Sequence, residues 1–154
     1  MQSLLRERIN GMPTRTRLFT GAAVGGVCVL PFYQGLWTAC TKAGLSLRLY
    51  PAGGLPLIVL LCLIGAVAGA GYALAMPRWN VPGWRTGALL GLLMTLLLWF
   101  VVSPLRGLPI AGDLQVVRMA QTLTIHVAWG ICLGISLKLL FAWTASRAAA
   151  PAPG

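Results

Sequence analysis

Apolar residues fill four long runs of the chain, and polar residues gather between them. The second run holds twenty residues without a charged side chain. As a helix it would measure about 30 Å, the usual thickness of the hydrocarbon layer of a bilayer. We therefore expect an all-α fold, an integral membrane four-helix bundle in one domain at 1–147, with a disordered tail at 148–154. The expected spans are 18–41, 57–76, 86–103 and 121–143.

Composition and charge point to lipid as the surroundings. Hydrophobic residues make up 58% of the chain and charged residues 9%, against roughly a quarter charged in soluble domains. The net charge of +10 would suggest nucleic acid in a soluble protein. Here the basic residues lie between or beside the apolar runs, where they can meet anionic headgroups. We expect membrane lipids as partners and no nucleic acid.

The basic residues also orient the chain, because short loops rich in Lys and Arg stay in the cytoplasm. Eight lie on the side that would hold both termini: Arg6, Arg8, Arg15, Arg17, Arg78, Arg85, Lys138 and Arg147. Four lie on the other: Lys42, Arg48, Arg106 and Arg118. This predicts a multi-pass protein with both termini cytoplasmic. The first run is longer and bulkier than the core of a signal peptide, so we expect it to be retained.

An internal repeat divides the chain into two halves. Residues 20–25 read TGAAVG and residues 86–91 read TGALLG, a displacement of 66 residues. Gly65 and Gly69 likewise precede Gly130 and Gly134 by 65 residues. The pattern predicts two helical hairpins that point the same way through the membrane, a parallel repeat of the kind found in transporters and in packing modules.

Each expected helix carries one pair of glycines four residues apart. In lipid, helices associate largely through close backbone approach over such small residues. We expect the bundle to be tight around these pairs, toward the cytoplasm, and open toward the outside. The predicted packing residues are Gly21, Gly25, Gly65, Gly69, Gly87, Gly91, Gly130 and Gly134.

Polar and aromatic residues follow the glycines outward along the same helix faces, and Pro31 is expected to kink the first helix. They predict a ligand-binding cleft in the outer half. The candidate residues are Tyr33, Trp37, Trp99, Thr122, His126 and Trp129.

His126 is the only histidine and the only ionisable side chain well inside an expected span. Such a group is a functional candidate by default. It could ligate a magnesium or iron macrocycle, relay protons, or bond to a quinone or a lipid headgroup. The alternative is a neutral imidazole bonded to Thr122, Thr124 or a neighbouring helix that only fixes packing. The sequence leaves the cofactor open.

Neither a metal site nor a catalytic site is indicated. Cys28, Cys40, Cys62 and Cys132 are separated by 12, 22 and 70 residues, which matches no zinc or redox framework. Buried cysteine behaves as a small apolar residue, so packing is the expected role. With one histidine and two carboxylates there is no acid/base pair, and we expect no enzymatic activity.

The segments SPLRGLP at 103–109 and HVAWG at 126–130 resemble the YagU-like family of bacterial inner-membrane proteins. The resemblance covers the last third of the chain, and it implies an inner-membrane location and little about activity. The expected function is a non-catalytic accessory or scaffold subunit that packs against other membrane proteins. The alternatives are a small transporter or channel component, and a pigment, haem or quinone binder through His126.

Overall fold

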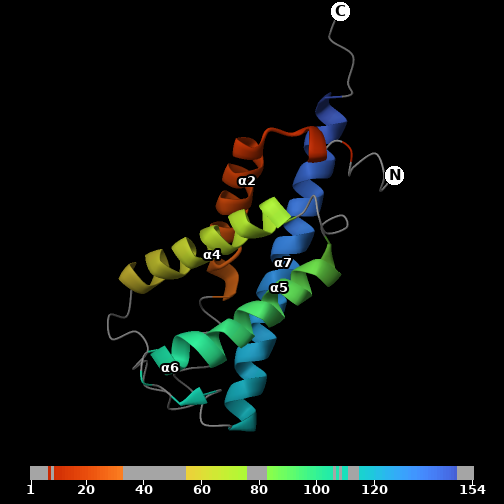
Figure 1. The fold of residues 1–154 in the computed structure, drawn as a ribbon. Helices are drawn as coiled ribbons and strands as arrows, with labels where there is room; N and C mark the ends of the chain where they lie inside the picture. Colours follow the sequence, from red (N-terminus) through yellow and green to blue (C-terminus); the bar gives the residue numbers. More distant parts are fainter. Residues whose placement is uncertain are drawn as a thin grey trace, which may run out of the picture.

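The computed structural model describes residues 7, 9–32, 55–75, 83–105, 107, 109–110 and 115–148. These residues are mostly helical and include no strand, so the all-α prediction is confirmed for this part of the chain. The main helices are α2 (Thr14–Val27), α4 (Leu55–Ala75), α5 (Trp84–Leu97) and α7 (Val116–Ala148) (Figure 1). A π-helical turn, Leu98–Val102, joins α5 to the short α6 (Ser103–Leu105).

Two helical segments are long and apolar enough to cross a membrane. They are Trp84–Leu105, with 22 residues, and Val116–Thr144, with 29. Leu61–Ala75 in α4 is apolar but shorter. Large apolar side chains lie on the outer surface, among them Phe19, Val67 and Leu139. These features are compatible with a membrane protein.

Pro31 accounts for the end of α2. A proline cannot donate a backbone hydrogen bond, and its ring clashes with the carbonyl four residues earlier, which is that of Val27. The last residue of α2 is Val27, and Cys28 and Val29 form a turn before the chain becomes helical again at 30–32. Residues 33–41 of the expected first span lie outside the described residues, as does 149–154 of the expected tail.

The first helix pair, α2 and α4, is held by backbone contact across glycines. Gly21 faces Gly69, and Gly25 faces Gly65. A Cβ atom placed on Gly21 would lie 2.5 Å from the carbonyl oxygen of Gly69 and 2.6 Å from the Cβ of Ala73. Since these separations are far below van der Waals contact, only glycine permits the crossing.

The second pair, α5 and α7, also crosses over glycines, but different positions of the repeat face each other. The repeat equates Gly91 and Gly130 with Gly25 and Gly65, which face each other in the first pair. In the second pair Gly91 instead faces the backbone of His126 and Val127, while Gly130 faces Gly87. The crossing is therefore shifted by about one helical turn, and the shift places His126 at the contact.

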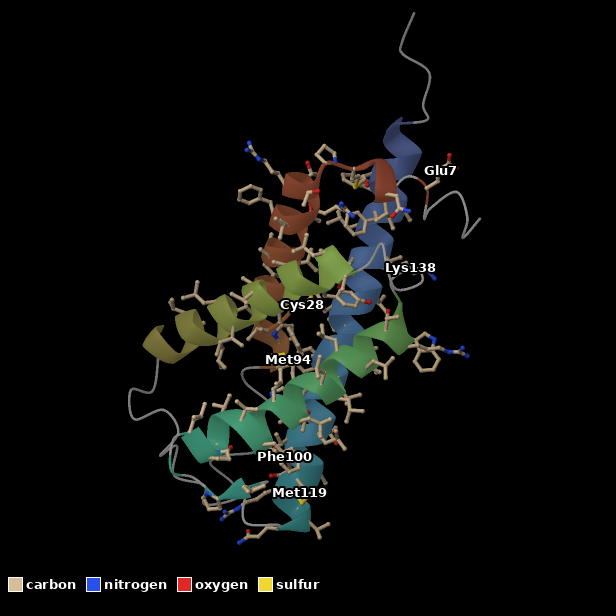
Figure 2. The ribbon with its side chains drawn as sticks, in the orientation of Figure 1. Glu7, Cys28, Met94, Phe100, Met119 and Lys138 are labelled. Atoms are coloured by element: carbon tan, nitrogen blue, oxygen red, sulfur yellow. The ribbon has the colours of Figure 1, made fainter. Side chains whose placement is uncertain are left out.

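The two pairs meet through α2 and α7, and through a polar link between α4 and α5. The Tyr72 hydroxyl lies 2.5 Å from Thr86 Oγ1. The Thr86 hydroxyl donates to the Gly83 carbonyl and accepts from the Gly83 N–H, both at 3.1 Å, which caps α5. Figure 2 shows Cys28 and Met94 near the middle of the molecule, and both belong to or pack against the buried apolar cluster around Trp129.

Replacing Gly69 with alanine should lower the free energy of unfolding by about 1 to 3 kcal/mol, because the added methyl group overpacks a backbone contact. A Cβ at this position would lie 2.9 Å from the Cα of Gly25. Gly71 is the matched control on the same helix, since nothing lies within 4 Å of its added Cβ. Gly71→Ala should be neutral or stabilising by up to about 1 kcal/mol. Thermal unfolding in one detergent measures both, and equal effects would contradict the assignment.

Candidate functional site

A cavity of about 90 Å³ lies where the two helix pairs come together. Its walls come from α4, α5, α7 and the residues that follow α2, and it is not fully enclosed. Almost all of its lining is apolar, so its two polar side chains define its chemistry. The lining residues are Val29, Phe32, Leu61, Ile64, Gly65, Met94, Ile125, His126 and Trp129.

The imidazole of His126 is fixed by its own helix. Its Nδ1 lies 2.8 Å from the carbonyl oxygen of Thr122, one turn earlier. Because a carbonyl only accepts hydrogen bonds, Nδ1 must carry the hydrogen. In the neutral ring Nε2 is then an acceptor, and no described residue provides a donor for it. The site therefore offers one free acceptor.

The indole of Trp129 provides a donor. The side chain is only 6% exposed, and its Nε1 has no hydrogen-bond partner among the described residues. Leaving a buried donor unsatisfied costs about 1 to 3 kcal/mol. Trp129 follows His126 by three residues, so the two side chains share one face of α7. Both side chains line the cavity, whose other walls are apolar.

The crossing of α5 and α7 sets the position of these two groups. A Cβ on Gly91 would lie 2.6 Å from the Cα of Val127, so α7 rests directly on α5 beside His126. One turn further along α5, the buried Thr95 hydroxyl donates to the Gly91 carbonyl at 2.9 Å. This bond satisfies the hydroxyl within its own helix and leaves the contact surface apolar.

The internal repeat gives the cavity two unlike halves. The residues of α4 that the 65-residue displacement equates with His126 and Trp129 are Leu61 and Ile64. All four line the cavity. Equivalent positions of the two halves therefore face one space, and only the second half supplies polar groups.

Only some of the predicted site residues line the cavity. His126 and Trp129 line the cavity together. Thr122 contributes its backbone carbonyl, while its hydroxyl donates to the carbonyl of Arg118 at 2.8 Å. Trp99 lies in the π-helical turn and does not line this cavity. Tyr33 and Trp37 lie outside the described residues.

Several contributors were missed by sequence reasoning. The lining residues Phe32, Leu61, Ile64 and Met94 carry no polar signal, and only their equivalence through the repeat could have indicated the α4 pair. The described part of the chain holds no group of three or more His, Cys, Asp or Glu that could bind a metal ion.

The cavity is too small to enclose a macrocycle. An engineered cavity of about 150 Å³ accommodates benzene. The space beside His126 measures about 90 Å³, so it admits a small head group and not a porphyrin or chlorin ring. Because the cavity is not fully enclosed, its volume limits the part of a ligand that lies inside it.

No protein-family model, curated protein or solved structure matches this chain.

The tautomer of His126 can be tested directly, because the chain has no other histidine. Nitrogen-15 NMR of the protein in nanodiscs at neutral pH should show a pyrrole-like Nδ1 and a pyridine-like Nε2. Thr122→Val is the control and should leave both signals unchanged, since the acceptor is the backbone carbonyl. The opposite tautomer or an imidazolium would contradict the geometry.

Proposed function

We propose that the chain is a multi-pass protein of a bacterial inner membrane, a four-helix bundle of two parallel-repeat hairpins with both termini in the cytoplasm. Two segments of membrane-spanning length, the apolar α4 and the exposed apolar side chains support this proposal. Antiparallel crossings over glycine in both pairs support it further, because such contacts are typical of helix association in lipid. The YagU-like resemblance agrees with the proposed location.

Arg17 supports anionic lipid as a partner. It lies in α2 near the expected cytoplasmic end, and its guanidinium donates to Thr14 Oγ1 at 3.3 Å. Nε and the other terminal nitrogen are buried and have no hydrogen-bond partner among the described residues. The positive charge of the guanidinium at this end of α2 would attract an anionic headgroup, although the two buried nitrogens are not in reach of it.

Within this frame, we propose that the protein binds the head group of a lipid-soluble alcohol in the cavity. The single observation behind this proposal is that Trp129, whose N–H has no partner among the described residues, and His126, whose Nε2 is an acceptor, line the same apolar cavity. A hydroxyl group both donates and accepts, so one hydroxyl can satisfy both side chains. Phenols and hydroquinones share this property.

Other ligand classes match the pair less well. A quinone carbonyl accepts from Trp129 but leaves Nε2 of His126 without a donor. A purely apolar chain leaves both groups unsatisfied, at a cost that a hydroxyl removes. The volume of about 90 Å³ limits the bound part to the hydroxyl and a few carbons, while the remainder of the ligand extends into lipid.

A photoactivatable long-chain alcohol should label residues lining the cavity in protein held in nanodiscs. Its methyl ether accepts but cannot donate, and it should label roughly five- to tenfold less, because one lost hydrogen bond costs about 1 kcal/mol. His126→Leu, which installs the residue of the equivalent α4 position, should remove this preference. Trp99→Phe is the control and should retain it. Equal labelling by alcohol and ether in the unaltered protein would overturn the proposal.

A second candidate is the accessory or scaffold subunit. The observation that favours it is the abundance of large exposed apolar side chains on every main helix, which can meet another protein as readily as lipid. Gentle extraction from native membranes followed by native mass spectrometry should then show the 16.3 kDa chain together with other membrane proteins. A lone chain, or a complex of this chain only, would count against this role.

A further inference from the structure

Two cysteines that are far apart in the sequence are in contact where the helix pairs meet. Cys28 Sγ and Cys132 Sγ are 3.8 Å apart, although 104 residues separate them. Cys132 donates to the Cys28 sulfur, and Cys28 donates to the Ser136 hydroxyl at 3.7 Å. Cys28 is 7% exposed and belongs to the buried apolar cluster. Two hydrogen bonds, from Cys132 to Cys28 and from Cys28 to Ser136, therefore join α7 to the end of α2.

The apolar surroundings favour disulfide formation over metal binding by the two thiols. Metal binding requires thiolates, and an uncompensated charge is costly in an apolar interior. A disulfide forms from two neutral thiols and is itself neutral. Oxidation to a disulfide therefore leaves no charge in the cluster.

The local backbone is suited to closing the bond. The sulfurs must approach to about 2.0 Å. Cys28 is the C-terminal cap of α2, and its N–H donates to the Val24 carbonyl at 2.9 Å, so its backbone is fixed and its side chain projects from the end of the helix. Cys132 lies in the middle of α7. Since the sulfurs are already 3.8 Å apart, rotation of both side chains and a small shift of the two helices would close the bond.

We propose that Cys28 and Cys132 form a redox-active dithiol, closed to a disulfide by a lipid-soluble quinone. Two S–H bonds break and one S–S bond forms, while two protons and two electrons pass to the quinone, which becomes a hydroquinone. Both cysteines lie within expected spans, so the oxidant has to be soluble in lipid. The site is separate from the proposed alcohol site and does not depend on it.

The disulfide would join the two helix pairs covalently. Cys28 precedes the cavity-lining Val29, and Cys132 follows Trp129 by three residues on α7. Oxidation would therefore fix two walls of the cavity relative to each other.

The test uses the full chain in nanodiscs, reduced and then freed of reductant under anaerobic conditions. A tetramethyl-substituted benzoquinone is the probe, because its ring carbons carry no hydrogen and do not readily add thiols. We expect a product about 2 Da lighter, a cross-linked peptide pair containing Cys28 and Cys132, and one hydroquinone per chain. Cys28→Ser and Cys132→Ser should lose all three.

Cys62 is the matched control, because it is a free cysteine on α4 outside the thiol pair. Cys62→Ser should behave as the unaltered protein. Cys28→Ala and Cys132→Ala replace the serine variants if these fail to fold. Full alkylation of Cys28 and Cys132 after quinone treatment would overturn the proposal. Cross-linking of either to another cysteine, or hydroquinone formation by Cys28→Ala, would overturn it as well.

Discussion

Direct contact between helix backbones, made possible by glycine, is the constraint on which the rest of the structure depends. In the proposed lipid surroundings there would be little drive for one apolar helix to leave lipid for another, so close packing would have to supply the attraction. At the first crossing a Cβ on Gly65 would lie 2.5 Å from Cγ2 of Val29, and one on Gly69 would press on Gly21 and Gly25. The second crossing repeats this arrangement at Gly87, Gly91 and Gly130. Any larger residue would separate the pair and with it the wall of the cavity.

The difference in register between the two crossings connects this packing to the site. If α5 and α7 met as α2 and α4 do, Gly130 would lie against Gly91. The shift of one turn puts the His126 backbone there instead, in a position where its ring and that of Trp129 reach the space between the pairs. The same repeat leaves Leu61 and Ile64 opposite them. One duplicated hairpin thus provides an apolar half and a polar half of a single cavity.

Local sequence patterns predicted much of this structure, but they did not predict the contacts between distant segments. Helix type followed from the apolar runs, and all eight glycines chosen for their spacing lie at crossings. His126 stood out as the only histidine, and the cavity contains it together with Trp129. Trp99 was placed by extending an i, i+4 ridge from Thr95, but it lies in the π-helical turn that begins at Leu98, where the winding differs, and it does not line the cavity.

Contacts between distant segments require the relative placement of the helix pairs, which spacing does not encode. The Cys28–Cys132 contact and the Tyr72–Thr86 bond both bridge the pairs, and neither belongs to a recognisable motif.

The interfaces within the pairs and the interface between them differ in chemistry. Within each pair, glycine brings the backbones together, and the buried Thr95 hydroxyl beside the second crossing is satisfied by its own helix. Between the pairs the helices are joined by side chains, and the hydroxyl, thiol, imidazole and indole groups of the interior are found there. Polar groups in an apolar interior need partners. At the junction between the halves Trp129 Nε1 still lacks a partner among the described residues, so a ligand that supplied an acceptor there would stabilise the protein.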